Sequence, residues 1–147
     1  MFSGMTATTT YSGSCLCTAV RYTVGGPAAT VCVCHCTICR RAVGSPGVPW
    51  ATFRRDELTV EGTVSWYGSS QHAKRGFCGA CGTSLFFETE HEPNAVDVTV
   101  ASMAEADKVV PRYHSWAPNK LAWETLVDNL PRYREDGGSL PMEGGKA

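Results

Sequence analysis

Three cysteines fall within six residues of this 147-residue chain, in the stretch Cys34-His35-Cys36-Thr37-Ile38-Cys39. A thiol exposed on a surface loop oxidises and forms cross-links, so three thiols this close together indicate that something holds them as thiolates. Metal ions that prefer soft ligands do so, and zinc is the commonest of these ions in proteins. A basic pair, Arg40-Arg41, follows directly. The stretch therefore predicts a zinc site.

Two further cysteine pairs have spacings that are typical of metal ligands. In Cys15-Leu16-Cys17, an extended chain points both sulfurs to the same side. In Cys78-Gly79-Ala80-Cys81-Gly82, the glycines let backbone amides point at the sulfurs, as in a zinc knuckle. A secreted disulfide scaffold is disfavoured, because the N-terminus lacks a secretory signal and the chain is long enough for a full core. The spacings expected for an iron–sulfur cluster do not match.

The composition narrows the class of protein. Thirteen basic and fourteen acidic residues leave a formal net charge of −1, so no overall positive field favours nucleic acid as the main partner. No apolar run approaches the roughly 20 residues of a membrane helix. Residues 1–10 are small, polar and threonine-rich. We predict a cytoplasmic protein with one domain at 11–133, between a disordered leader at 1–10 and a flexible tail at 134–147.

The elements that must position the cysteines are mostly strands. Alternating apolar residues and short apolar runs predict strands at 19–24, 29–33, 50–53, 58–60, 64–67 and 95–101. The strand at 29–33 runs directly into the cysteine stretch, so these cysteines lie at a strand end. A short helical turn at 37–42 is expected to stop at Gly44 and Pro46. Many short strands with little helix indicate a mainly β domain.

The order of these motifs resembles the glutathione-dependent formaldehyde-activating enzyme family, whose members have an Mss4-like zinc-binding fold. The resemblance covers Tyr11 to Tyr133 and is carried by Gly13-Ser14-Cys15-Leu16-Cys17, by Cys34-His35-Cys36-Thr37-Ile38-Cys39-Arg40-Arg41, by Ser69-Ser70 and by Arg75-Gly76-Phe77-Cys78-Gly79-Ala80-Cys81-Gly82-Thr83-Ser84-Leu85. A weaker match lies at 123–133. One CxxC motif is weak evidence, whereas three cysteine clusters in this order and spacing are specific.

The resemblance implies several curved antiparallel sheets, zinc knuckles, little helix and two zinc ions per chain. One ion is structural and has a closed set of four thiolate ligands, Cys15, Cys17, Cys78 and Cys81. The second is of the catalytic type, because its three ligands leave one position open for water or substrate; they are Cys34, Cys36 and Cys39.

Two residues depart from the family pattern. Thr18 stands where a glycine is common in the family. Cys32 lies outside the motif, and in an extended strand it shares a face with Cys34 and Cys36. Cys32 either closes the second site as a fourth thiolate or is a small buried apolar residue that binds no metal. We favour the second interpretation, because one zinc ion rarely accepts all four ligands from so tight a loop.

The resemblance implies a zinc-dependent carbon–sulfur lyase of the S-(hydroxymethyl)glutathione synthase type, or a relative that acts on another glutathione-like thiol and a small aldehyde. An open zinc can hold a substrate thiolate or polarise the carbonyl oxygen. The family motif has an arginine at Arg75, which, like Arg40 and Arg41, can pair with substrate carboxylates. His35 lies between two ligands and is expected to orient the site rather than bind its metal. The predicted catalytic group is Cys34, Cys36, Cys39, His35 and Arg75.

Two non-catalytic functions compete with the lyase. The family includes centromere protein V, which suggests a scaffold or nucleic-acid-associated zinc module, although the balanced charge counts against nucleic acid. The second alternative is a redox or metal switch, since a three-thiolate zinc site can be oxidised with release of its metal. His114, near Trp116, either lines the site or packs in the core.

Overall fold

Strands account for most of the ordered elements in the computed structural model, which describes residues 9–137. The strands are β1 (Thr10–Ser14), β2 (Arg21–Gly25), β3 (Thr30–Cys34), β4 (Val48–Arg54), β5 (Leu58–Glu61), β6 (Val64–Ser70), β7 (Ala73–Cys78), β8 (Ser84–Thr89), β9 (Ala95–Thr99) and β10 (Tyr113–Ser115). The helical elements are α1 (Thr37–Val43) and the 3₁₀ turns η1 (Arg55–Glu57), η2 (Val100–Ser102), η3 (Ala106–Lys108) and η4 (Ala117–Asn119). The predicted mainly β fold is confirmed.

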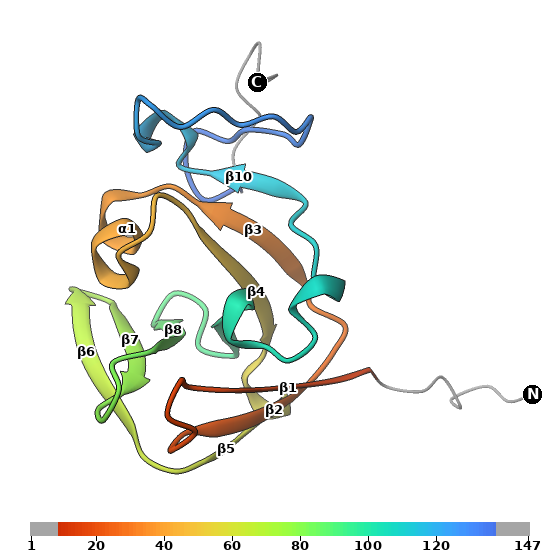
Figure 1. The fold of residues 1–147 in the computed structure, drawn as a ribbon, viewed down its shortest axis with the longest axis vertical. Helices are drawn as coiled ribbons and strands as arrows, with labels where there is room; N and C mark the ends of the chain where they lie inside the picture. The colour runs from red at the N-terminus through yellow and green to blue at the C-terminus, as the bar shows by residue number, and fades with distance from the viewer. Residues whose placement is uncertain (1–8, 138–147) are drawn as a thin grey trace, which may run out of the picture.

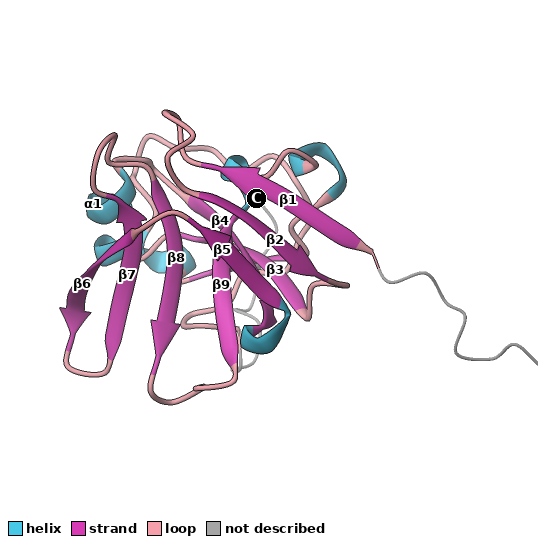
Figure 2. Cartoon of the chain, turned by 90° about the horizontal axis from the view of Figure 1, so that it is seen from below, coloured by secondary structure: helices cyan, strands magenta, loops and turns pink. Residues whose placement is uncertain are grey.

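The strands form two sheets. A seven-stranded sheet has the order β10-β3-β4-β9-β8-β7-β6, and a three-stranded sheet has the order β1-β2-β5. Neighbouring strands are antiparallel except for β10, which pairs with β3 in parallel. Figure 1 shows the larger sheet curving from β10 and β3 round to β7 and β6, with the smaller sheet across the bottom. In the view from below, β1, β2 and β5 lie in front of the larger sheet (Figure 2).

The main core lies between the two sheets. Its buried residues include Val20, Tyr22, Val24, Val31, Ala51, Phe53, Leu85, Phe86, Val96 and Val98. Because successive side chains of a strand point to opposite faces, the strands of the larger sheet also present residues to its other face. Tyr22 packs edge-on against Phe86, with ring centroids 5.4 Å apart, and so joins β2 of the smaller sheet to β8 of the larger. The two sheets therefore share one continuous apolar layer.

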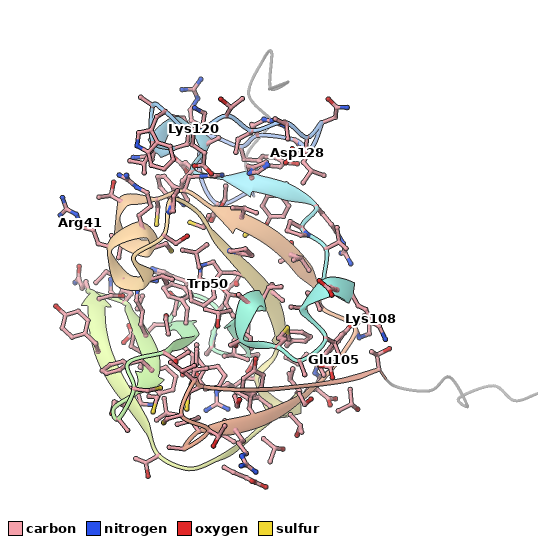
Figure 3. All side chains as sticks on the ribbon, in the orientation of Figure 1. Arg41, Trp50, Glu105, Lys108, Lys120 and Asp128 are labelled. Atoms are coloured by element: carbon pink, nitrogen blue, oxygen red, sulfur yellow. The ribbon has the colours of Figure 1, made fainter. Side chains whose placement is uncertain are left out.

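A second, smaller apolar cluster lies on the opposite face of the larger sheet. Trp50 and Ala51 are neighbours on β4, and Ala51 belongs to the main core whereas Trp50 belongs to this second cluster. Trp50 packs against Phe87 of β8, with ring centroids 6.2 Å apart. Cys34 and Cys39 are buried in the same cluster. Trp50 lies near the middle of the molecule in Figure 3.

The helix α1 follows β3 after two residues and closes one end of this second cluster. The Sγ atom of Cys36 caps its N-terminus by accepting a hydrogen bond from the Cys39 backbone N–H at 3.2 Å. The helix ends at Gly44, whose φ of 75° lies in the left-handed region that glycine adopts without strain. The helical turn predicted at 37–42 is therefore present and is one residue longer.

Several elements differ from the expectations, since β1, β7, β8 and β10 are not among the predicted strands. The polar segment after Ser70 turns into β7, an inner strand that the alternation pattern does not reveal because arginine and glycine interrupt it. The strand expected at 95–101 ends at Thr99, and η2 follows. Most of the predicted leader and tail lies outside the described residues, and within residues 9–137 no helix has the length and apolarity to cross a membrane.

Candidate metal centres

The first centre is made of four cysteines that come from distant parts of the chain. Cys15 and Cys17 follow β1, and Cys78 ends β7, with Cys81 in the turn behind it. Their four Sγ atoms all lie within 4.8 Å of one another. The Cys17 sulfur is 3.7 Å from that of Cys15 and 3.7 Å from that of Cys78. These separations match the edge of about 3.8 Å expected for a tetrahedron with zinc–sulfur bonds of about 2.3 Å.

Backbone amides and one hydroxyl point at the sulfurs of this first centre. The Val20 N–H donates to the Cys15 sulfur at 3.2 Å, and the Cys81 N–H points at the Cys78 sulfur at 3.5 Å. The Thr83 hydroxyl lies 3.2 Å from the Cys81 sulfur. Such donors stabilise thiolates, which are the form that binds metal. The donor set therefore fits zinc.

Thr18 lies in the turn behind the first cysteine pair. Its φ of 65° is in the left-handed region, which costs a β-branched residue on the order of 1 kcal/mol relative to glycine. The turn is nevertheless held by a hydrogen bond from the Thr18 N–H to the Cys15 carbonyl at 3.1 Å. The backbone conformation thus gives a physical reason why glycine suits this position.

The second centre is made of the three cysteines around the start of α1. Cys34 ends β3, Cys36 caps α1 and Cys39 lies in its first turn. Their Sγ atoms all lie within 4.8 Å of one another, and Cys34 and Cys39 are buried while Cys36 is half-buried. Three converging soft donors fit zinc, with one position of a tetrahedron left to another ligand.

The three thiols cannot all ionise on their own. Hydrogen bonds from the thiols of Cys34 and Cys39 lower the pKa of Cys36 far below its usual range. The same contact with Cys36 raises the pKa of Cys34, because a second negative charge so close to the first is opposed. The cluster therefore carries several thiolates only when a cation offsets their charge.

Cys32 lies outside the second centre. Its sulfur is not within 4.8 Å of all three sulfurs of Cys34, Cys36 and Cys39, and it accepts a hydrogen bond from the Ser115 hydroxyl at 3.8 Å. Burial raises the pKa of the Cys32 thiol to about 11, which keeps it protonated. This arrangement favours a small packed residue over a fourth ligand.

Arg75 of β7 reaches the second centre across the larger sheet. Its Nη1 donates to the Cys39 sulfur at 3.5 Å, and its guanidinium lies 4.9 Å from the centroid of the Phe87 ring. The residue is 7% exposed, and its Nε has no hydrogen-bond partner among the described residues. Arg75 therefore places a buried positive charge beside the sulfurs. Arg41, by contrast, points outward from α1 in Figure 3.

His35 points away from the sulfurs and into a chain of polar groups. Its Nε2 lies 2.8 Å from Nδ1 of His114, whose Nε2 lies 3.0 Å from the nearer carboxylate oxygen of Asp128. His35 is fully buried, and burial, with a smaller contribution from the neighbouring His114, lowers its pKa to about 4. The expectation that His35 orients the site stays a prediction, and the geometry gives it a partner. The sequence does not single out Asp128, although it lies within the weaker family match at 123–133.

Comparisons with known proteins agree with the pattern of cysteines. A family model described as glutathione-dependent formaldehyde-activating enzyme matches residues 10–119, a range that contains both cysteine centres, Arg75 and His114. A curated relative from Schizosaccharomyces pombe, described as an uncharacterized lyase, is 34% identical over 77 residues, which are 52% of this chain and 56% of the relative. The chain thus matches little more than half the length of that relative.

A solved structure has a related fold. The crystal structure of a Rhodobacter sphaeroides protein superposes with a TM-score of 0.54 and 30% sequence identity, covering 63% of this chain and 87% of that chain. The match to the family model ends at residue 119.

Proposed function

Because the chain belongs to the glutathione-dependent formaldehyde-activating enzyme family, we propose that it is a zinc-dependent carbon–sulfur lyase of the S-(hydroxymethyl)glutathione synthase type, or a relative that acts on another glutathione-like thiol and a small aldehyde. The observation that carries the proposal is the group of three converging cysteine sulfurs with a buried arginine beside it. A lyase-related function is also supported by the matched relative from Schizosaccharomyces pombe, which is described as a lyase.

In this proposal the two centres have different functions. Cys15, Cys17, Cys78 and Cys81 hold a structural zinc, because four thiolates fill a tetrahedron and leave no place for a substrate. Cys34, Cys36 and Cys39 hold the second zinc, and the fourth position is left for the substrate sulfur. When bound there, zinc lowers the pKa of a thiol and keeps it as a thiolate at neutral pH.

The reaction joins two substrates without oxidation or reduction. The sulfur of the thiolate attacks the carbonyl carbon of the aldehyde, so that a carbon–sulfur bond forms while the π bond of the carbonyl breaks. The electron pair moves to the oxygen, which takes up a proton in place of the one that the thiol released. The reverse process breaks the carbon–sulfur bond, which is the lyase direction. Holding the two reactants in contact is the main contribution required of the protein.

Arg75 balances the charge of the second centre in this proposal. Three thiolates exceed the charge of one zinc ion by one unit, and the guanidinium beside Cys39 supplies a positive charge at a buried position. The arriving substrate thiolate is then the only excess negative charge in the cluster, which makes its binding less costly. Because Arg75 already contacts Cys39, the pairing of substrate carboxylates falls to more exposed groups such as Arg41.

Binding of the thiol substrate tests the proposal most directly. We expect the zinc-loaded protein to bind glutathione in a calorimetric titration, and S-methylglutathione, which lacks a free thiol, to bind far more weakly. Subsequent addition of formaldehyde is expected to consume the thiol faster than in the absence of protein. No binding at millimolar glutathione, with two zinc ions confirmed by metal analysis, would contradict glutathione as the substrate.

A further inference from the structure

A chain of polar side chains, made of two buried imidazoles and the 42% exposed carboxylate of Asp128, connects the second cysteine centre with the C-terminal segment. It begins at His35, between two of the cysteines, and passes to His114 over 2.8 Å. It continues from His114 Nε2 to the two carboxylate oxygens of Asp128, at 3.1 and 3.0 Å. His35 and His114 are 0% and 3% exposed, so both rings depend on these partners for their hydrogen bonds.

The carboxylate fixes the direction of each hydrogen bond in the chain. An ionised carboxylate only accepts, so Nε2 of His114 carries a hydrogen, and in the neutral imidazole Nδ1 is then the acceptor. His35 must then donate from its Nε2. This leaves Nδ1 of His35 as a bare nitrogen, 3.8 Å from Glu124 Oε2 and without a hydrogen-bond partner among the described residues. One carboxylate therefore selects the tautomers of two imidazoles.

Asp128 is itself held firmly. Arg132, which is 5% exposed, donates from Nη1 to the Asp128 carboxylate at 3.1 Å and from Nη2 to the Asp128 carbonyl at 3.0 Å. The Leu130 N–H donates to the same carboxylate at 3.0 Å. These donors favour a single orientation of the Asp128 carboxylate. Figure 3 shows Asp128 in the segment that crosses above β10.

The backbone of the C-terminal segment also holds the part of the chain that contains His35. The strand β10 pairs with β3 on one side, and residue 132 bridges to it on the other. The His35 N–H donates to the Ser115 carbonyl at 3.0 Å, and the Tyr133 N–H donates to the His114 carbonyl at 2.8 Å. Both the backbone and the side chain of His35 are therefore fixed by residues that follow β9 in the sequence.

Fixing His35 decides where the neighbouring sulfurs point. In an extended backbone, successive side chains alternate between two sides. Cys34 ends β3, and Cys36 has extended dihedral angles, with φ −63° and ψ 151°. When the imidazole between them is held on one side by His114, the two cysteine side chains are directed together to the other side, where Cys39 lies.

We infer that Asp128 is a positioning residue for the Cys34–Cys36–Cys39 centre, and that it acts through His114 and His35. The inference rests on the second metal site of the proposed function but not on the identity of the substrate. It assigns a function to the segment after residue 119, which the family match does not reach. The first cysteine centre has no such connection among the described residues, and it serves as an internal reference.

The test compares zinc binding at the two centres in the full chain. Asp128→Ala removes the acceptor of His114, and we expect it to weaken zinc binding at the second centre by about 10- to 100-fold, as for other changes to groups that orient metal sites. Binding at the first centre should not change. Asp128→Asn keeps an oxygen that accepts from His114 and should recover most of the loss. The control is Asp56→Ala, which removes an exposed carboxylate, also paired with an arginine at 2.6 Å.

Three measurements distinguish an effect of Asp128 on the second centre from a loss of overall stability. Release of zinc to a chelator is assigned to each centre by comparison with Cys39→Ser, and the midpoint of thermal unfolding reports any loss of stability. Nitrogen-15 spectra of the imidazoles in the unmutated protein should show hydrogen on Nε2 of both His35 and His114. In Asp128→Ala the His114 tautomer should no longer be fixed, which a merely structural effect would not produce.

Three outcomes would overturn the inference. They are unchanged zinc release in Asp128→Ala, an equal weakening of both centres, or a hydrogen on Nδ1 of His114 in the unmutated protein. If the second centre takes no zinc, the inference fails together with that part of the proposed function. A protein that binds two zinc ions but no glutathione would contradict only the proposed substrate, because none of these measurements uses glutathione.

Discussion

At the scale of residues, charge on the outer face of the larger sheet is set by side chains from separate strands. Asp97 of β9 pairs in register with Phe87 of β8, which in turn pairs with Arg75 of β7, so the three side chains lie on one face. Thr52 donates to the Asp97 carboxylate at 2.5 Å. The alternation of Val96, Val98 and Val100 predicts that Asp97 lies on the face away from the main core, but it does not predict that this face is partly buried as well.

Stability should depend on pH through Asp97. Burial raises its pKa to about 6, so the folded protein favours the neutral carboxyl group. The folded state therefore binds the proton more tightly than the unfolded state, and stability falls as the pH rises from about 4 through 6. Asp97→Asn, which has no charge to bury, should gain on the order of 2 kcal/mol relative to the unmutated protein between pH 4 and pH 7.

Urea unfolding at several pH values measures this difference. Asp56→Asn is the matched control, because Asp56 is exposed and the hydrogen bond from Arg54 lowers its pKa instead. That variant should show no gain in unfolding free energy over the unmutated protein as the pH rises. If the unfolding free energies of Asp97→Asn and the unmutated protein are equal at every pH, then the folded protein does not bury a charged carboxylate at Asp97.

At the scale of elements, the turns at the ends of strands and helices restrict which residue fits more tightly than the strands do. Gly62 lies between β5 of the smaller sheet and β6 of the larger, with φ +90°. A Cβ at this position would lie 2.1 Å from the Ala19 carbonyl oxygen, which belongs to the backbone and cannot rotate away. Gly44 at the end of α1 also has a positive φ, of +75°, but no atom lies within 4 Å of a Cβ added there.

These two glycines make a matched pair for mutation. Gly44→Ala meets only the strain of the left-handed backbone and should cost about 1 kcal/mol of unfolding free energy. Gly62→Ala adds a clash with fixed backbone and should cost several kcal/mol, on the order of 3 or more. Urea unfolding of the zinc-loaded variants measures both. Equal costs would show that the loop at Gly62 moves freely.

At the scale of the whole molecule, the first cysteine centre joins the two sheets. Cys15 continues from β1 of the smaller sheet, and Cys78 ends β7 of the larger. Both are 2% exposed and belong to the main core, whereas Cys39 belongs to the smaller cluster on the other face. If metal binds at both centres, the first contributes to the stability of the whole fold and the second mainly to local order.

The same substitution at the two centres distinguishes these contributions. Cys78→Ser should leave the protein unfolded or close to it, because a structural zinc contributes on the order of 10 kcal/mol to folding. Cys39→Ser should reduce the zinc content from two ions to one and leave the main unfolding transition in place. Metal analysis and thermal unfolding of both variants provide the measurements. A Cys39→Ser protein that keeps both ions would show that the three-thiolate site is wrong.

The sequence by itself determined the family, the mainly β class and the cysteines that fall into local clusters. It could do so because ligand spacing and strand alternation are local properties, readable over a few residues. It also placed Cys34 at the end of a strand and the short helix behind it. The sequence does not reveal the strand β7, because Arg75 and Gly76 interrupt its apolar pattern.

Only the tertiary structure decided which groups meet across the fold. It brought Cys15 and Cys17 to Cys78 and Cys81, a set that the sequence indicated only through the family resemblance, and it aimed Arg75 at Cys39. It also joined His35 to His114 and Asp128. The physical reason is that these contacts depend on strand order and register, which are set by the packing of the two sheets as a whole and leave no local pattern in the chain.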